Sequence, residues 1–267
     1  MSERFVALIT GASSGIGEAS ARRLAREPGA RLVLVARREE RLRRLAEELG
    51  GATIIVADLL DADTPTRVRE TTQQAHGRLD LLVNNAGGSW RSSFADGGWE
   101  DLERHMKLNF EAQARLTEAL LPLLRRTAQS TARGVSIVNV ASLAARVSRP
   151  NAGAYSASKA ALAAWSDTLR AEERTRGIHV GLVLPGFIAT EGFPANELRT
   201  SPLTRWIVSK PEVVAEAIVA AGPGGKPERY APRGYWLAAA LRILVPRLAR
   251  RLTAGGAFTT STGAPRE

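Results

Sequence analysis

Residues 5–17 read FVALITGASSGIG, and this stretch decides the fold. Its first five residues form a short apolar run with β-branched members, which predicts a strand buried on both of its faces. Residues 10–17 place three glycines directly after that strand, and a helical pattern then continues to Ala25. Strand, glycine turn and helix in this order predict a phosphate cradle, because glycine lets the backbone approach a ligand and a helix N-terminus offers free N–H groups. A tight strand-to-helix turn without a ligand is the alternative.

Apolar strands and helices continue to alternate along the chain. Such alternation predicts a parallel sheet with right-handed crossovers and helices on both faces. We therefore expect an α/β fold, a Rossmann-like doubly wound parallel sheet in a single domain. The length of 267 residues suits one large domain of this kind and is too short for two ordinary ones. Further strands are expected at residues 32–35, 53–57, 79–83, 135–140 and 179–184.

The composition excludes several kinds of site. The chain has no cysteine, so it has no disulfide, no thiolate metal site and no cysteine nucleophile. His76, His105 and His179 are scattered; we interpret them as ordinary structural or surface residues and expect no metal site. Residues 1–5 lead into the first strand without a signal-peptide pattern, and no apolar run approaches the roughly 20 residues of a membrane span. We therefore expect a cytoplasmic location.

The formal net charge is +10, from 37 basic and 27 acidic residues. The arginines are spread over many expected helices, and acidic residues accompany them, as in residues 38–41 (REER). Solvated surface charge is therefore favoured over attraction to acidic surfaces or phosphates. The sequence contains no DNA- or RNA-binding motif, and we expect no nucleic-acid partner.

The second expected strand ends at Ala36, and Arg37 and Arg38 follow it about 20 residues after the glycines. A site for NAD(H) would place an acidic residue here to hold the ribose 2′-hydroxyl. An arginine instead suits a 2′-phosphate, through a charge-assisted hydrogen bond worth about 1.5–3 kcal/mol. The sequence therefore predicts NADP(H) rather than NAD(H). In the alternative interpretation, both arginines merely open a charged helix.

Polar residues gather where the later strands end, and ligands of open α/β sheets bind at that edge. Asp58 follows the third strand, residues 84–88 (NNAGG) follow the fourth, and Ser142 follows the fifth. A long helix is expected over residues 99–126, and Asn109 is an unusual residue inside it by helix propensity. A simple turn at 84–88 and a solvated Asn109 side chain are the alternatives.

Residues 155–159 read YSASK and open a helix that is expected to run to about Arg176. On a helix, Tyr155 and Lys159 share a face. An ammonium roughly 4 Å from a phenol, at an effective dielectric of about 20, favours the phenolate by about 4 kcal/mol. That is roughly three pKa units, enough to bring a tyrosine towards neutrality and suit it to general acid–base catalysis. A Tyr–Lys pair at this spacing also occurs by chance in many helices.

Taken together, the motifs over residues 4–222 resemble the short-chain dehydrogenase/reductase family, in its single-domain branch. The resemblance implies an enzyme that interconverts a carbonyl and an alcohol by hydride transfer with NADP(H). It is carried by TGxxxGIG at residues 10–17, NNAG at 84–87, Asn109, Ser142, Tyr155, Lys159, Pro185, Gly186 and Thr190.

The resemblance implies a role for each matched residue. Tyr155 would protonate the carbonyl oxygen, Ser142 would hydrogen-bond the same oxygen, and Lys159 would lower the Tyr155 pKa and bind the ribose hydroxyls. Asn109 would hold a water of the proton relay. Contacts to the cofactor are implied at the glycine turn and the strand ends, by Gly11, Ser13, Ser14, Gly15, Ile16, Gly17, Arg37, Arg38, Asp58, Leu59, Asn85, Ala86, Gly87, Tyr155, Lys159, Pro185, Gly186, Ile188 and Thr190.

The end of the chain departs from the family pattern. We expect an NADP-binding domain over residues 1–233, with a brief edge strand at 229–232, and a basic appendage over 234–267. Residues 235–252 carry leucines at helical spacing beside four arginines, and Pro246 is expected to kink this helix. The helix could pack on its own domain or on a second subunit of a homodimer or homotetramer, lie on an anionic membrane surface, or be disordered.

The substrate and two other classes of function stay open. Residues 191–207 resemble the lid of such enzymes, and their apolar content hints at a small to medium lipophilic carbonyl or alcohol. A sugar-nucleotide epimerase or dehydratase would usually have different glycine spacing. A non-catalytic NADP(H)-binding regulator would not need to keep Ser142, Tyr155 and Lys159 together.

Overall fold

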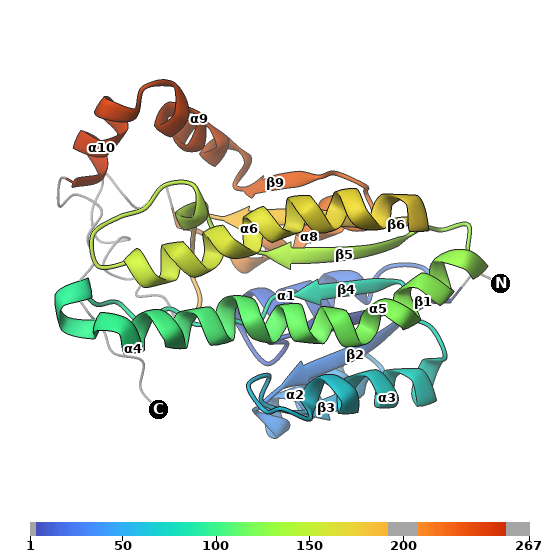
Figure 1. Cartoon of the computed structure of the whole chain (residues 1–267). Coiled ribbons are helices and arrows are strands. Elements are labelled where there is room, and N and C mark those ends of the chain that lie inside the picture. The colour runs from blue at the N-terminus through green and yellow to red at the C-terminus, as the bar shows by residue number, and fades with distance from the viewer. Residues whose placement is uncertain (1–3, 192–207, 255–267) are drawn as a thin grey trace.

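The computed structural model describes residues 4–191 and 208–254 of the chain. Its centre is a seven-stranded sheet in which neighbouring strands are parallel, in the order β3-β2-β1-β4-β5-β6-β9 (Figure 1). The chain runs from β1 to one edge and then returns past β1 to build the other half. The predicted doubly wound sheet is therefore confirmed. The strands are β1 Phe5–Thr10, β2 Ala30–Ala36, β3 Thr53–Val56, β4 Leu81–Asn84, β5 Val135–Val140, β6 Ile178–Pro185 and β9 Glu228–Ala231.

Helices cover both faces of the sheet, as Figure 1 shows. One face is covered by α1 Gly15–Leu24, α2 Glu39–Glu48 and α8 Pro211–Ala221. The opposite face is covered by α3 Thr64–His76, α5 Ala112–Ser130 and α6 Gly153–Glu173, whereas α4 Phe94–Met106 lies beyond the carboxyl edge of the sheet and packs on α6.

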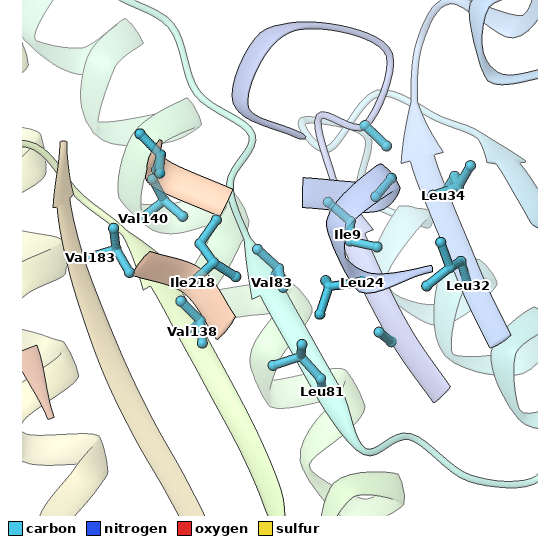
Figure 2. Close-up of a cluster of buried hydrophobic side chains, with 14 of the residues drawn as sticks. Ile9, Leu24, Leu32, Leu34, Leu81, Val83, Val138, Val140, Val183 and Ile218 are labelled. Atoms are coloured by element: carbon cyan, nitrogen blue, oxygen red, sulfur yellow. The ribbon is translucent and has the colours of Figure 1, made fainter. Parts of the chain in front are cut away.

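Side chains of one strand alternate between two apolar cores. Along β1, Ile9 packs in the core beneath α1 and α8, whereas Leu8 packs beneath the helices of the opposite face. Figure 2 shows the first of these cores, where Leu24 of α1 and Ile218 of α8 lie against the strands. Because both faces are covered, β1 is an unbroken apolar run from Phe5 to Ile9.

The prediction of one long helix over residues 99–126 is wrong, both in its bounds and in its regularity. The helical segment begins at Phe94, and its backbone leaves helical geometry at Gly98, where φ is 52° and ψ is −147°. A π-helical turn, η1 Lys107–Glu111, then joins α4 to α5. Glycine tolerates the positive φ, so the break occurs there. The π turn contains Asn109, and such turns are frequent at functional sites.

The C-terminal part follows β9, which pairs with β6 and confirms the expected edge strand. The expected single kinked helix is instead two helices, α9 Trp236–Leu244 and α10 Pro246–Ala254. Proline cannot continue α9 but suits the first position of α10, so the chain turns at Val245. Figure 1 shows both helices outside the two helical layers. Within residues 4–191 and 208–254, no helix is both long and apolar enough to cross a membrane.

Candidate active site

The glycine turn between β1 and α1 has the compact geometry that its sequence predicts. Gly11 and Gly15 have φ values of +65° and +55°, which side chains rarely adopt. A Cβ atom at Gly17 would lie 2.2 Å from the Gly11 carbonyl oxygen, so this position also requires glycine. The turn therefore brings the N-terminus of α1, with its N–H groups that have no intrahelical partner, to the carboxyl edge of the sheet.

Hydrogen bonds of the Thr10 side chain connect this turn to the end of β4. Its Oγ1 donates to the Val83 carbonyl (3.2 Å) and accepts the N–H groups of Asn85 and Ala86, each at 3.0 Å. The Asn85 amide donates in turn to the Thr10 carbonyl at 2.9 Å. The side chain of Asn85 thus connects the ends of β1 and β4. Ala86 and Gly87 follow Asn85 along the carboxyl edge of the sheet.

The two arginines after β2 lie in different places. Arg38 donates through Nη2 to Ser14 Oγ (2.6 Å) and through Nε to Ser13 Oγ (3.2 Å), so it lies against the glycine turn. Arg37 points elsewhere: its side chain is 77% exposed and its Nη1 lies 3.5 Å from Asp58. Arg38 is thus the arginine at the phosphate cradle.

Arg38 and Arg41 share a carboxylate. Glu191 accepts from Arg38 Nη1 at 3.0 Å and from Arg41 Nη1 at 2.6 Å. The guanidinium groups, Arg41 first, lower the pKa of Glu191 by stabilising its charged form. Arg41, which the sequence analysis did not single out, therefore belongs to the same charged cluster as Arg38.

Ser142 and Tyr155 meet above the end of β5. Ser142 caps the short helix η2 Leu143–Ala145, and its Oγ accepts the N–H of Ala144 at 3.1 Å. Tyr155 faces Ser142, and hydrogen bonding with the Ser142 side chain lowers the pKa of Tyr155. Tyr155 is half-buried on the first turns of α6, which begins at Gly153.

The pKa of Tyr155 is raised in the structure, which is opposite to the expected direction. Burial of the phenol is the largest cause, since it disfavours the charged form. The hydrogen bond from Ser142 and the positive charges of Arg149 and Arg91 oppose this rise. The cations that lower the Tyr155 pKa are therefore two arginines that the sequence analysis did not identify.

Lys159 is buried on the same face of α6, with 4% of its surface exposed. Its Nζ donates to the Val140 carbonyl at the end of β5, at 2.9 Å. Burial lowers the pKa of Lys159 to about 8, because an ammonium loses its hydration inside the protein. The amine therefore carries its positive charge below about pH 8.

Asn109 lies in the π turn and faces Gly87 and Gly88. Its Oδ1 accepts the Gly88 N–H, and its Nδ2 donates to the Gly88 carbonyl, each at 2.9 Å. The same Nδ2 lies 3.1 Å from Ser158 Oγ on α6. A Cβ atom at Gly87 would lie 2.7 Å from Asn109 Oδ1 and 3.3 Å from Lys159 Nζ. Asn109 and Lys159 thus converge on the glycines after β4, and the solvated alternative for Asn109 is wrong.

A buried amide network lies under this cluster. Asn84 Nδ2 donates to Asn139 Oδ1 and to Thr117 Oγ1, each at 2.8 Å. Asn139 Nδ2 then donates to Ser166 Oγ at 2.8 Å. The network connects β4, β5, α5 and α6, so it fixes the helices that carry Asn109 and Tyr155 relative to the sheet.

His105, which the sequence analysis places among structural or surface residues, is buried beside Tyr155. The two rings are in edge-to-face contact, with centroids 6.1 Å apart. The imidazole Nε2 accepts the N–H of Trp90 at 3.1 Å, and Nδ1 lies 2.8 Å from the Asp101 carbonyl oxygen. The spacing of four residues between His105 and Asn109 is the sequence signal that could have identified it.

The loop after β6 completes the edge. Pro185 ends β6, and the side chain of Ile188 is buried in the core beneath α1 and α8, so it does not face the site. Ile188 lies on the short strand β7 Phe187–Ile188, which pairs with β8 Val208–Ser209. A Cβ atom at Gly15 would lie 3.0 Å from the Thr190 methyl group, so this loop touches the glycine turn. The expected lid at 191–207 lies outside the described residues apart from Glu191.

The comparisons with known proteins agree with this architecture. The family model described as short chain dehydrogenase matches residues 5–199. The chain belongs to the short-chain dehydrogenase/reductase family of oxidoreductases.

Similar relatives come from animals, bacteria and plants. The chain is 35% identical to dehydrogenase/reductase SDR family member 7B of Danio rerio over 69% of this chain and 61% of that protein. It is 35% identical to the uncharacterised oxidoreductase YxnA of Bacillus subtilis over 92% of this chain and 70% of that protein. It is 41% identical to 11-beta-hydroxysteroid dehydrogenase 1A of Arabidopsis thaliana, over 70% and 53% of the two chains. The chain spans about three fifths of the length of the SDR family member 7B proteins that it matches.

Two solved structures with bound NADP-type cofactors share the fold. The RhlG/NADP complex of Pseudomonas aeruginosa has a TM-score of 0.74 and 31% identity, covering 84% of this chain and 93% of that one. An alcohol dehydrogenase of Thermococcus sibiricus with 5-hydroxy-NADP has a TM-score of 0.71 and 28% identity, covering 81% and 89%.

The residues at the edge of the sheet fit a nicotinamide dinucleotide. A turn that only glycine can form holds the N-terminus of α1 open for a pyrophosphate. Beside this turn, Arg38 with Ser13 and Ser14 offers a cation and hydroxyls. At the other end, Lys159 and the Tyr155–Ser142 pair present proton donors.

Proposed function

We propose that this protein is an NADP(H)-dependent oxidoreductase that interconverts a carbonyl and an alcohol. The observation that carries the proposal is the convergence of Asn109 and Lys159 on Gly87, beside the Ser142–Tyr155 pair, at the sheet edge that also holds the glycine turn. When bound, the nicotinamide would supply or accept the hydride.

Tyr155 would act as the general acid and base. In reduction its phenol donates a proton to the substrate oxygen, and in oxidation the phenolate removes that proton. Because burial raises the pKa of Tyr155, the protonated acid predominates at neutral pH. Reduction should therefore be rapid at neutral pH and fall as the pH rises through the Tyr155 pKa, whereas oxidation should rise over the same range.

The remaining side chains would position the reacting groups. Ser142 donates to the same substrate oxygen and so aligns it with the phenol. Lys159 would donate to the ribose hydroxyls, and its hydrogen bond to the Val140 carbonyl holds the ammonium in place. Asn109 fixes the glycines at 87–88 and, through them, the edge along which the cofactor lies; a water of the proton relay beside it remains our expectation.

The preference for NADP(H) over NAD(H) rests on Arg38. A guanidinium that already bonds two hydroxyls of the phosphate cradle is placed to meet a 2′-phosphate, and Arg37 and Arg41 add positive charge around it. Asp58 would border the adenine. The side chain of Leu59 is buried in the core of the face covered by α3 and α5, so only its backbone would contribute to this border. The substrate would be lipophilic and small to medium in size.

Assembly and location are further proposals. Phe94 and Trp99 on α4 expose 76% and 70% of their surfaces, which supports a homodimer or homotetramer because large aromatic side chains are enriched in interfaces. We also propose a cytoplasmic location, and an appended segment at 234–267 beside the domain formed by residues 1–233.

The test measures the decrease in NADPH absorbance when the purified protein is mixed with ketones, aldehydes or oxoacyl thioesters. A parallel series uses NADH. NADPH oxidation that depends on the carbonyl compound is the expected result. Tight NADPH binding without turnover across the panel would instead favour a non-catalytic regulator. Substrate conversion without net oxidation of the cofactor would favour an epimerase or dehydratase.

A further inference from the structure

The helices α9 and α10 carry an unusual concentration of exposed apolar side chains. In the described part of the chain, twelve large apolar side chains are exposed, and seven of them belong to residues 236–252. Ile243 and Leu244 expose 75% and 77% of their surfaces. Single exposed leucines are ordinary, but such a cluster marks an interaction surface. We call it the C-terminal surface; it consists of Trp236, Leu237, Ile243, Leu244, Val245, Leu248 and Leu252.

Small and large side chains of these helices differ in exposure. Ala239 of α9 and Ala249 of α10 are each only 4% exposed, whereas the large side chains of the C-terminal surface face outward. Trp236 and Ile243 are seven residues apart, as are Leu237 and Leu244, which places both pairs on one side of α9. Tyr235, just before α9, packs on Phe187 with ring centroids 6.5 Å apart.

The charge around this surface has one sign. Residues 229–254 contain six arginines and no aspartate or glutamate. An apolar surface whose own segment supplies arginines and no acidic residue complements a layer that is apolar inside and anionic outside.

A second copy of the chain fits this surface poorly. A two-fold contact through the C-terminal surface would bring the arginines of α10 in both copies together, including Arg247 and Arg251, with no carboxylate from residues 229–254 to neutralise them. An anionic lipid surface has no such conflict, because each arginine near it gains attraction while the apolar side chains enter the acyl region.

We propose that α9 and α10 attach this protein to the surface of anionic membranes. The apolar side chains of the C-terminal surface enter the lipid interface, and the arginines contact the lipid phosphates. Neither helix crosses the membrane, since each has nine residues. Figure 1 shows both helices on the side to which the strand arrowheads point, which is the edge that carries the candidate site. The ring of Tyr235 also contacts Gly186 in the loop after β6, since a Cβ atom at Gly186 would lie 2.2 Å from that ring.

The experiment measures binding of the full chain to vesicles by co-sedimentation. One set of vesicles is pure phosphatidylcholine, and a second set contains phosphatidylglycerol as the anionic lipid. We expect binding to the anionic set that weakens with added salt. Ile243→Ser with Leu244→Ser should weaken it at least about tenfold, because both side chains are largely exposed and their removal leaves no hole in the protein. Arg247→Gln with Arg251→Gln should weaken it by about fivefold per arginine.

Matched controls change the same residue types elsewhere. Leu60→Ser with Val213→Ser removes two exposed apolar side chains, and Arg43→Gln with Arg44→Gln removes two charges from α2. These variants should bind as the unmodified chain does. Far-ultraviolet circular dichroism and thermal unfolding, unchanged for all variants, confirm that the fold is intact.

Three results would overturn the proposal. The first is no binding to either set of vesicles, and the second is equal loss in the control variants. The third is a change of oligomeric state in light scattering without vesicles, caused by Ile243→Ser with Leu244→Ser, because it would assign the surface to a second copy. None of these readouts uses turnover, so the membrane proposal and the proposed reaction are tested separately.

Discussion

The charged groups of the two halves of the candidate site lie in different environments. On the cofactor side, the Arg38 side chain is 43% exposed and shares Glu191, itself 58% exposed, with Arg41. On the catalytic side, Lys159 is 4% exposed and bonds a backbone carbonyl. Water screens the first group of charges, so each contact there is worth little and can exchange with a ligand. The second group is desolvated, so its pKa values shift from their ordinary values. Replacing a side chain of this group should therefore have a larger effect than replacing an exposed one.

The largest effect is expected from Tyr155→Phe, which removes one hydroxyl from the buried half. Turnover should fall by about 10²–10⁴-fold, since a general acid and base is lost. NADPH affinity, measured by fluorescence titration, should change by less than about twofold because the exposed half is untouched. A variant with near wild-type turnover would remove Tyr155 from the proposed mechanism.

Lys159→Met tests whether burial of the ammonium costs stability. Its pKa of about 8 in the folded chain, against 10.5 for a hydrated lysine, corresponds to about 3 kcal/mol of destabilisation below pH 8. The unfolded chain holds this proton between pH 8 and 10.5 while the folded chain does not, so wild-type stability gains from Lys159 as the pH rises through that window.

The variant should therefore be more stable at pH 7 by about 1–3 kcal/mol, after loss of the Val140 hydrogen bond, and should have little turnover. Urea unfolding at pH 7 and pH 9 measures this. Lys107→Met is the matched control, because Lys107 has a 53% exposed side chain and its replacement should change stability little. A less stable Lys159→Met variant at pH 7 would contradict the argument.

Arg38→Leu tests the exposed half. NADPH affinity should fall by about 10–150-fold, the equivalent of a lost charge-assisted hydrogen bond, while NADH affinity stays nearly constant. Arg37→Leu is the matched control, because Arg37 pairs with Asp58, whereas Arg38 donates to Ser14 of the glycine turn. If Arg37→Leu has the larger effect on the ratio of NADPH to NADH affinity, the assignment of Arg38 is wrong.

Glu191→Gln gives the smallest effect. Its carboxylate occupies both Arg38 and Arg41, so removal of its charge should strengthen NADPH binding, but only about two- to fivefold because these ion pairs are exposed. Glu216→Gln removes a carboxylate that pairs with Arg23 between α1 and α8 and should leave the affinity unchanged. Weaker NADPH binding by Glu191→Gln would show that the carboxylate supports the site and does not compete with it.

The sequence by itself determined the elements whose causes are local. The apolar run of β1, the glycines at 11, 15 and 17, and the alternation of strands and helices specify a doubly wound parallel sheet, because each depends on neighbouring residues. The carboxyl ends of parallel strands meet at one edge, so the meeting of Ser142 with Tyr155 could also be anticipated. The edge strand β9 and the break at Pro246 followed from proline chemistry.

Only the tertiary structure decided the features that depend on which way a side chain points and how much water it loses. Arg37 and Arg38 are equivalent in sequence, but successive residues after a strand point to opposite sides, and the sheet places Arg38 on Ser14. The same packing buries His105 beside Tyr155 and reverses the expected direction of the Tyr155 pKa. It also turns the large side chains of α9 outward, which no periodicity could show, since an apolar face has the same pattern whether a protein core or a lipid surface covers it.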